Sequence, residues 1–319
     1  MAKKPVIYID GKEGTTGLQI YERLGGREDI ELLLIDEDKR KDPIERARLM
    51  NQADIVFLCL PDAASMEAVS MIENDHVTVL DTSTAHRTND AWDYGFAELS
   101  AAHRRAIENS SRVANPGCHA SGFVALAAPL VKLGIIPKDA LLTCFSLTGY
   151  SGGGKKMIAE YEGNERDIAL DSPRQYGLTQ QHKHLPEMQH VPGLASTPIF
   201  APIVADFYSG MEVTIPFFRS QLRCGEHPIE EITAALKEHY FGSPIVKVLS
   251  QEEVADMKGF VASNALSGHD GMELMVLGND ERIQLVSRFD NLGKGSSGAA
   301  LQCLNLMMGL DETFGLNLA

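Results

Sequence analysis

The chain has 319 residues, which is enough for two domains or one large one, and 44% of them are hydrophobic and 23% charged, as in globular proteins. Its net charge of −15 argues against nucleic acid or an anionic membrane as a partner, because such a surface repels both and no basic stripe offsets it. An anionic metabolite is still compatible with this net charge, provided that a local pocket of Lys, Arg and backbone N–H groups binds it. No apolar run approaches the roughly 18–20 residues of a membrane span, and residues 1–5 lead into a strand without a signal-peptide pattern.

The cysteines are odd in number and widely spread, and no two of them have CxxC spacing: Cys59, Cys118, Cys144, Cys224 and Cys303. Such a distribution is typical of reduced thiols in the cytoplasm, without disulfides or structural zinc.

Residues 5–10 predict a buried first strand, and a glycine-rich turn with an apolar helical pattern follows it. Glycines at a tight strand-to-helix turn let backbone N–H groups approach a pyrophosphate at the helix N-terminus. The spacing is GxxGxxG instead of the common GxGxxG, so a plain glycine turn is the alternative. Its position after the first strand favours a dinucleotide site, for which the candidate residues are Gly11, Gly14, Thr15, Thr16 and Gly17.

A second strand, residues 30–35, ends at Asp36. This acid lies about 20 residues beyond the glycines, where a carboxylate often binds the ribose 2′-hydroxyl of NAD. Lys39 and Arg40 stand beside it and suit the 2′-phosphate of NADP instead. A solvated charged loop is the third interpretation, so these residues leave the cofactor open.

Further strands are predicted at residues 53–60 and 77–80, with a helix at residues 63–72 between them. The second of these strands runs into a polar segment that contains Ser83 and Arg87. Ligands bind at the carboxyl edge of an open α/β sheet, so this segment is a candidate binding loop. The alternation of strands and helices predicts a parallel, doubly wound domain of the Rossmann type.

A short strand, residues 112–114, is followed by the turn Asn115-Pro116-Gly117 and by a helical pattern from His119 onward. Cys118 therefore lies where a helix begins, close to the positive end of the helix dipole and to unpaired backbone N–H groups. Both favour the thiolate, which is the nucleophilic form. A buried structural cysteine is the alternative.

After residue 134 a strand at residues 140–147 runs into a glycine-rich loop. Residues 149–155 match the GxxxxGK part of a phosphate-binding loop, but Lys156 replaces the Ser or Thr that would bind magnesium. The pattern favours a phosphate cradle over a nucleoside triphosphatase, with a flexible loop as the alternative. The candidate phosphate-binding residues are Ser151, Gly152 and Lys155.

His182 and His184 are followed closely by Glu187. An HxH pair can bind a metal, but no third ligand falls at a suitable spacing, so no metal is expected. The pair is interpreted instead as a source of a proton-transfer group for Cys118, with a surface histidine pair as the alternative.

The remainder predicts strands at residues 198–204, 210–217 and 283–289 in a largely antiparallel sheet, and a helix at residues 228–240. A small-residue segment at residues 290–298 opens the last helix, which suits close approach to a cofactor or another helix.

The chain resembles the N-acetyl-gamma-glutamyl-phosphate reductases over essentially its whole length, and in particular their shorter members. The motifs that carry the resemblance are Gly11-x-x-Gly14-x-x-Gly17, Asn115-Pro116-Gly117-Cys118, His182-Lys183-His184-x-Pro186-Glu187 and Asp290-Asn291-Leu292-x-Lys294-Gly295. The resemblance implies a fold similar to glyceraldehyde-3-phosphate and aspartate-semialdehyde dehydrogenases: an α/β Rossmann domain (1–117 and 292–319) and an inserted α+β catalytic and oligomerisation domain (118–291).

The resemblance also implies the reaction: NADPH-dependent reduction of N-acetylglutamyl 5-phosphate to the semialdehyde and phosphate, through a thioester on Cys118, in cytoplasmic arginine biosynthesis. His182, more than His184, would move the protons and Glu187 would orient it, while Asn115 and the Cys118 N–H would stabilise the oxyanion. Asn291 and Lys294, with Ser83 and Arg40, are further cofactor candidates, and Arg87 is a further phosphate or substrate candidate.

A homodimer or homotetramer is expected. The alternatives are a sister enzyme for aspartyl or aminoadipyl phosphate, a non-redox thiol acyltransferase and a non-catalytic nucleotide-binding regulator.

Overall fold

The computed structural model describes residues 4–318, which form two compact units. Unit 1 comprises residues 4–116 and 299–315, and unit 2 comprises residues 117–298 and 316–318. The sequence placed the last boundary at residue 292, whereas the chain leaves unit 2 after Gly298. The difference arises at Asp290, whose carboxylate accepts the Leu292 N–H at 2.8 Å and whose carbonyl accepts the Gly295 N–H at 3.0 Å. These bonds coil the segment, and Ser209 Oγ of unit 2 donates to Asp290 Oδ2 at 3.0 Å, which holds it there.

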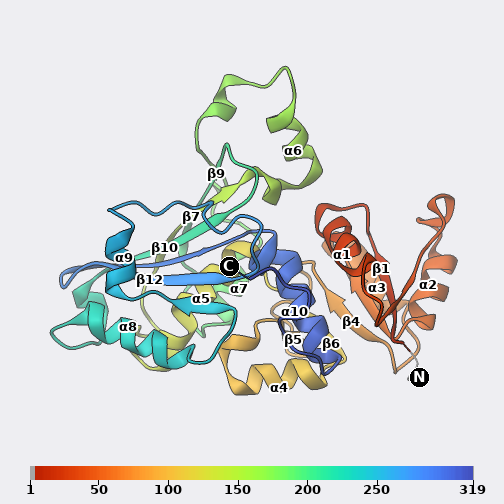
Figure 1. The fold of residues 1–319 in the computed structure, drawn as a ribbon, viewed down its shortest axis with the longest axis horizontal. Helices are drawn as coiled ribbons and strands as arrows, with labels where there is room; N and C mark the ends of the chain where they lie inside the picture. Colours follow the sequence, from red (N-terminus) through yellow and green to blue (C-terminus); the bar gives the residue numbers. More distant parts are fainter. Residues whose placement is uncertain (1–3, 319) are drawn as a thin grey trace. The chain divides into compact units, whose positions relative to one another are not determined.

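Unit 1 is built on a six-stranded parallel sheet with the order β2-β1-β3-β4-β6-β5. Its strands are β1 (Val6–Asp10), β2 (Glu31–Leu33), β3 (Ile55–Leu58), β4 (Thr78–Asp81), β5 (Asp93–Tyr94) and β6 (Arg112–Ala114). Its helices are α1 (Thr15–Gly25), α2 (Pro43–Gln52), α3 (Asp62–Ser70), α4 (Ala101–Asn109) and α10 (Gly298–Met307), which returns from the far end of the chain (Figure 1). The predicted parallel, doubly wound domain is confirmed.

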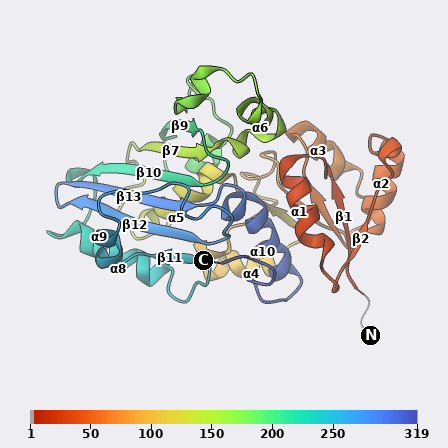
Figure 2. The ribbon, with the colours of Figure 1, turned by 45° about the horizontal axis from the view of Figure 1, so that its top comes forward.

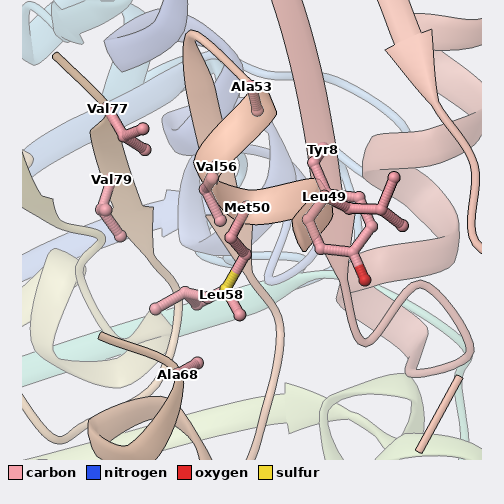
Figure 3. Close-up of a cluster of buried hydrophobic side chains, with 9 residues drawn as sticks. All are labelled: Tyr8, Leu49, Met50, Ala53, Val56, Leu58, Ala68, Val77 and Val79. Atoms are coloured by element: carbon pink, nitrogen blue, oxygen red, sulfur yellow. The ribbon is translucent and has the colours of Figure 1, made fainter. Parts of the chain in front are cut away.

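The core of unit 1 explains why the apolar runs become central strands. Met50, Val56 and Leu58 are buried where α2 packs against the sheet, and Tyr8 of β1 lies beside Leu49 in the same cluster (Figure 3). Each side chain of this size that is removed from water stabilises the fold by about 1.5–3 kcal/mol. Strands buried on both faces read as continuous apolar sequence, which is the pattern that predicted them.

Unit 2 contains a seven-stranded mixed sheet with the order β11-β12-β13-β10-β7-β9-β8. Its strands are β7 (Thr143–Gly149), β8 (Arg174–Gln175), β9 (Ile199–Ala205), β10 (Met211–Phe218), β11 (Val246–Val248), β12 (Met272–Asn279) and β13 (Arg282–Phe289). The pairs β11–β12 and β7–β9 are parallel and the other pairs are antiparallel, so the expected, largely antiparallel sheet is confirmed. Gly278, with φ +111°, lies at the β12–β13 hairpin, where a positive φ favours glycine.

One face of this sheet is covered by helices. The helices of unit 2 are α5 (Cys118–Lys132), α6 (Gly154–Glu162), α7 (Leu185–His190), α8 (Pro228–His239) and α9 (Gln251–Asp256). The nearly all-apolar α5 packs on β10 and β13, and α8 packs beside it on β12 (Figure 2). The buried Tyr240 hydroxyl, just after α8, donates to the Ala125 carbonyl of α5 at 2.7 Å. Helix α5 is therefore fixed against the sheet, and so is its first residue, Cys118.

Helix α6 and the chain that links it to β8, the edge strand paired with β9, lie outside the sheet, as Figures 1 and 2 both show. Within residues 4–318, no helix is both long enough and apolar enough to span a bilayer.

Candidate active site

Cys118 is the first residue of α5, directly after the chain leaves strand β6 through Asn115, Pro116 and Gly117. Gly117 has extended backbone angles (φ −78°, ψ 144°) and no side chain caps this helix end. The α5 dipole and its first N–H groups therefore act on the partly exposed Cys118 thiol and favour the thiolate. The strand–turn–helix arrangement predicted for this motif is confirmed.

The other cysteines lie in surroundings that disfavour a thiolate. Burial raises the pKa of the Cys59 thiol to about 12 and raises that of Cys144 as well. Burial and the charge of Glu231 also raise the pKa of Cys224. Cys303 is buried and its thiol donates to the Gly95 carbonyl at 3.4 Å. Cys118 alone, among these five residues, begins a helix.

Glu187 is hydrogen-bonded to the nucleophile turn, the segment Asn115-Pro116-Gly117 that leads into Cys118. Its side chain is 1% exposed, and its Oε1 accepts the Gly117 N–H at 2.8 Å. Helix α7 supplies this carboxylate from its first turn. A short, charge-assisted hydrogen bond to a buried carboxylate fixes the peptide that precedes Cys118.

His182 and His184 lie in one cluster of rings with His119, Tyr176 and Phe200. The ring centres of His182 and His184 are 4.8 Å apart, and each lies 5.6 Å from the ring centre of His119. The structure thus places the two histidines predicted from the sequence next to the residue that follows Cys118.

The ring of His182 is oriented by the backbone. Its Nδ1 accepts the His184 N–H at 3.1 Å, so the neutral ring carries its proton on Nε2. This bond orients His182 at Nδ1, and Oε1 of Glu187 accepts the Gly117 N–H, so the orientation of His182 by Glu187 stays a prediction. Burial, together with the positive charge of Lys183, lowers the pKa of His182 to about 4. The ring is therefore neutral at physiological pH.

His119 and Tyr176 are site residues that the sequence analysis missed. His119 is 3% exposed; its Nδ1 lies 2.6 Å from Ser146 Oγ and its Nε2 lies 2.6 Å from Tyr176 Oη. A histidine buried in an otherwise apolar helix, next to a reactive cysteine, is a signal that the sequence did contain. Tyr176 had no such signal, because only the folding of unit 2 brings it to His119.

The segment after β13 also reaches the nucleophile. It forms a π-helical turn, Gly293–Ser297, a conformation that is frequent at functional sites. A Cβ atom added to Gly295 would lie 3.0 Å from the Cys118 Cβ, so glycine permits this close approach. Lys294, a cofactor candidate, is 1% exposed in this turn.

Asn291 links three segments of unit 2. Its Oδ1 accepts the Gly210 N–H at 2.9 Å, and its amide donates to Ser151 Oγ at 3.0 Å. Ser151 itself is 1% exposed, whereas Gly152 and Lys155 are exposed. Of the phosphate candidates, Ser151 is thus held by Asn291, while Gly152 and Lys155 lie at the surface of the same loop.

The glycines in the turn between β1 and α1 are of two kinds. A Cβ on Gly11, which has φ +88°, would lie 2.4 Å from the Cys59 carbonyl oxygen, and one on Gly17 would lie 2.4 Å from the Gly11 carbonyl oxygen. Packing against the backbone already requires glycine at these two positions. Gly14 precedes α1, its nearest neighbour would lie at 3.5 Å, and no side chain caps the helix.

The uncapped start of α1 fits a pyrophosphate. The Thr15 hydroxyl in its first turn is buried and has no hydrogen-bond partner among the described residues, and Thr16 follows it. The first turn of α1 contains no acidic residue that would repel an anion. The residues present therefore fit a dinucleotide.

Asp36 and its neighbours lie on an exposed turn after β2. Asp36 is 3.6 Å from Lys39, and Glu37 is 3.5 Å from Arg40. Exposed ion pairs at such distances contribute little to the stability of the fold. Either cation is therefore available to pair with a bound phosphate instead.

The polar segment after β4 is held by Asp81, which is fully buried. Its Oδ2 accepts from Ser83 Oγ at 2.6 Å and lies 2.6 Å from His86 Nδ1. Arg87 donates to the carbonyl of Asn115 at 2.7 Å and to that of Thr82 at 3.0 Å. Arg87 therefore braces Asn115, the first residue of the nucleophile turn, directly after β6.

Among residues 4–318, no group of His, Cys, Asp and Glu side chains is arranged to hold a metal ion.

Comparison with known proteins identifies the family to which the chain belongs. The chain is 45% identical over 323 aligned residues to the N-acetyl-gamma-glutamyl-phosphate reductase of Trichormus variabilis, covering 98% of this chain and 99% of that protein. It is 46% identical to the enzyme of that name from Sinorhizobium medicae, covering 96% of this chain and 99% of that protein. The chain belongs to the N-acetyl-gamma-glutamyl-phosphate reductase family.

Family models and solved structures agree with this membership. Residues 37–108 match the model "Semialdehyde dehydrogenase, NAD binding domain", and residues 118–291 match "Semialdehyde dehydrogenase, dimerisation domain". Aspartate semialdehyde dehydrogenase II of Vibrio cholerae superposes with a TM-score of 0.72 at 15% identity, covering 97% of this chain and 99% of that chain. The Francisella tularensis enzyme gives 0.71 at 14%, covering 95% and 100%. As an N-acetyl-gamma-glutamyl-phosphate reductase family member, the chain is an oxidoreductase with the semialdehyde dehydrogenase fold and a nicotinamide dinucleotide cofactor.

Proposed function

We propose that the chain reduces N-acetyl-L-glutamyl 5-phosphate to N-acetyl-L-glutamate 5-semialdehyde and phosphate, with NADPH, as a step of arginine biosynthesis. The observation that carries the proposal is Cys118 at the start of α5, beside a ring cluster in which His119 and His182 are neutral. The names of the relatives supply the substrate.

In the first half-reaction the Cys118 thiolate attacks the acyl carbon. The carbon–oxygen bond to phosphate breaks, phosphate leaves with the electron pair, and a thioester remains on Cys118. The Cys118 N–H, and Asn115 three residues earlier, stabilise the oxyanion as it forms. Fixing the preceding peptide through Glu187 keeps this geometry constant between substrate and transition state.

In the second half-reaction the thioester carbon is reduced by the hydride that the bound nicotinamide supplies. His182, whose neutral ring carries a proton on Nε2, donates a hydrogen bond to the oxyanion that hydride addition creates. The oxyanion re-forms the carbonyl as the carbon–sulfur bond breaks and its electron pair leaves with sulfur, so the semialdehyde is released and the thiolate of Cys118 is restored. His182 is the proposed proton carrier, and His184 fixes its ring through the backbone.

The cofactor is proposed to be NADP, bound by unit 1. Gly11, Gly14 and Gly17, with Thr15 and Thr16, would hold the pyrophosphate at the α1 N-terminus. The exposed cations Lys39 and Arg40 would bind the 2′-phosphate, which Asp36 alone would repel. Ser83 of unit 1 is a further proposed contact, and Asn291 and Lys294 of unit 2 remain cofactor residues predicted from the sequence.

Phosphate departure is proposed to use the loop at residues 149–155. Lys155 offers a cation at the surface of this loop, and Ser151 and Gly152 offer a hydroxyl and a backbone N–H. Arg87, in the polar segment after β4, is proposed to act beside the nucleophile turn, because it donates to the Asn115 carbonyl. These groups would supply positive charge that the acidic surface as a whole lacks.

A homo-oligomer is proposed, with the part of the unit 2 sheet that α9 leaves uncovered, over β7, β9 and β10, as the dimer surface. Phe145 is 47% exposed and is paired with Thr214 and Ala201, so it lies on that face. Ile199 and Phe218 lie on it two or four residues from these partners and are 62% and 63% exposed. A second copy would remove this patch from water. The match of residues 118–291 to a dimerisation domain supports it.

A cytoplasmic location is proposed, supported by the five cysteines, all of which are free thiols.

The reverse reaction tests the function. The purified chain should oxidise N-acetylglutamate semialdehyde only when NADP and inorganic phosphate are both present, because phosphate must cleave the thioester. Oxidation that does not depend on phosphate, or equal kcat/KM for aspartate or aminoadipate semialdehyde, would contradict the proposal. Acyl transfer without any need for NADP would favour a thiol acyltransferase.

A further inference from the structure

The side chain of Ser151 is fixed in place in the loop after β7. Its backbone N–H donates to the Tyr208 carbonyl at 3.0 Å, which holds the start of the loop. Ser151 is 1% exposed, and its Oγ lies 3.0 Å from Nδ2 of Asn291, which is 2% exposed. The hydroxyl therefore has one defined side-chain partner, and this partner comes from the segment after β13.

The direction of the hydrogen bond between Ser151 and Asn291 follows from the other end of the amide. A backbone N–H can only donate, and that of Gly210 lies 2.9 Å from one side-chain atom of Asn291, which must be the oxygen Oδ1. The atom that faces Ser151 is consequently the amide nitrogen, which can only donate. Ser151 Oγ is the acceptor in this bond, so the hydrogen of its hydroxyl is not used there.

The hydrogen of the Ser151 hydroxyl has no acceptor among residues 4–318. A donor that is buried without an acceptor is unfavourable, which is why buried polar groups in proteins nearly always have a partner. An acceptor that arrives with a ligand would complete the hydrogen bonding of Ser151.

Gly152 leaves room for such a ligand beside the amide of Asn291. It is exposed and directly follows Ser151. A Cβ atom added to Gly152 would lie 3.5 Å from Asn291 Nδ2 and 3.6 Å from Thr148 Oγ1, which are ordinary contact distances, so packing does not require glycine here. A backbone without a side chain lets an anion approach its N–H group closely. The exposed Lys155, three residues later, supplies positive charge in the same loop.

The segment that carries Asn291 also reaches the nucleophile. The Asp290 carbonyl accepts the Gly295 N–H at 3.0 Å, which coils the chain between these two residues. A Cβ atom added to Gly295 would lie 3.0 Å from the Cys118 Cβ. One coiled segment of unit 2 therefore lies against Cys118 and, through Asn291, against Ser151.

We propose that Asn291 positions the Ser151 hydroxyl to donate a hydrogen bond to the phosphoryl group of the acyl phosphate, and to inorganic phosphate in the reverse reaction. The inference rests on the proposed function, which assigns the loop at residues 149–155 to phosphate. Asn291 is then a positioning residue, because its amide occupies the acceptor of Ser151 and directs the hydroxyl hydrogen toward the ligand. This role is separate from the cofactor contact predicted for Asn291 from the sequence.

The test is the reverse reaction of the full chain, in which the semialdehyde is oxidised with NADP while the concentration of inorganic phosphate is varied. Ser151→Ala removes only the hydroxyl. The KM for phosphate should rise about tenfold or more, because a hydrogen bond to a charged group is lost. The kcat and the Kd for NADPH should change by much less, since the hydroxyl is proposed to bind phosphate alone. An unchanged KM for phosphate would overturn the proposal.

A double-mutant cycle shows whether Asn291 acts through Ser151. Asn291→Ala should also raise the KM for phosphate, because the hydroxyl of Ser151 is no longer directed toward the ligand. In the Ser151→Ala background the same substitution should have little further effect. Additive effects of the two substitutions, or a raised Kd for NADPH with an unchanged KM for phosphate, would overturn the proposal.

Ser209→Ala is the matched control. It removes a buried hydroxyl that donates to Asp290 Oδ2 at 3.0 Å, and Asp290 directly precedes Asn291, but the bond between Asn291 and Ser151 stays in place. This variant should lose stability without a rise in the KM for phosphate. A rise equal to that in Asn291→Ala would show that loosening of the segment is the cause, and would overturn the proposal.

Asn291→Asp decides the matter if Asn291→Ala does not fold. The carboxylate keeps an acceptor for the Gly210 N–H, but its second oxygen can only accept, so the Ser151 hydroxyl turns inward. The added charge repels phosphate in any background, so the measure is the rise in KM beyond that caused by the same substitution in Ser151→Ala. No such excess would overturn the proposal. Failure of the proposed function is distinguishable, because the wild type would then show no phosphate-dependent oxidation at all.

Discussion

The Glu187 carboxylate accepts the backbone N–H of Gly117, at 2.8 Å, inside unit 2. Gly117 is the residue before Cys118, so a side chain 70 positions later in the sequence fixes the peptide on which the nucleophile stands. The HxHxPE motif therefore has two separable parts: His182 faces the ring cluster, and Glu187 supports the turn.

The support by Glu187 gives the first prediction. Glu187→Ala leaves the buried Gly117 N–H without this acceptor and should lower the free energy of unfolding by about 1–3 kcal/mol. Glu187→Gln keeps an acceptor oxygen and should lower it by less. Urea denaturation of the two variants measures the difference. Equal stability of the Ala and Gln variants would show that the bond does not hold the turn.

The two histidines should differ in their effect on catalysis. Asn at position 182 keeps an acceptor for the His184 N–H but has no atom at the Nε2 position. We expect His182→Asn to lower kcat by about 10²–10⁴-fold and to flatten the pH–rate profile. His184→Asn, the matched variant, should retain the shape of the profile. The reverse order of effects would assign the proton carrier to His184.

The lowered histidine pKa values predict a pH-dependent stability. His182 and His119 titrate at about 4 and about 3 in the folded chain, against about 6.5 when unfolded. Below about pH 6.5 the unfolded chain takes up protons that the folded chain does not. The free energy of unfolding should therefore fall as the pH is lowered from about 7 to about 4. His119→Gln should make this decline shallower, and an identical slope in the wild type and the variant would contradict the assignment.

The glycine turn makes a prediction about the cofactor. Gly14→Ala adds a methyl group whose nearest protein neighbour is at 3.5 Å, so the fold should tolerate it. The same methyl group would lie where the pyrophosphate is proposed to approach, and the Kd for NADPH should rise about tenfold or more. Gly26→Ala, at the other end of α1 and with no neighbour within 4 Å, is the control. Fluorescence titration measures both, and equal affinities would place the dinucleotide elsewhere.

Much of the fold could be predicted because its signals are local. Continuous apolar runs located β1, β3 and β4, and the Asn115-Pro116-Gly117 turn placed Cys118 at the start of α5. The mixed order of the unit 2 sheet could not be predicted, because strand pairing depends on contacts between distant residues. Strands as short as β8 carry too few residues for a pattern.

The sequence predicted which residues belong to the site better than it predicted how those residues are arranged. Cys118, His182 and Glu187 were found because motifs carry them, but the partners of each were not. The Nδ1 partner of His182 is a backbone N–H, and no side-chain pattern reveals such a bond. Tyr176 was missed for a related reason: its hydroxyl reaches His119 from 57 residues away.

Covalent catalysis by Cys118 is the central claim, and acylation of this residue tests it most directly. The chain is mixed with N-acetylglutamyl phosphate without NADPH, quenched, and analysed by peptide mass spectrometry, with Cys118→Ser and Cys224→Ser as variants. The predicted result is an N-acetylglutamyl group on Cys118 in the wild type and in Cys224→Ser, which NADPH discharges as the semialdehyde. Cys118→Ser should carry no such group and should lose at least about 10³-fold in turnover. Wild-type turnover in Cys118→Ser, or a rapid turnover during which Cys118 is never acylated, would contradict the account.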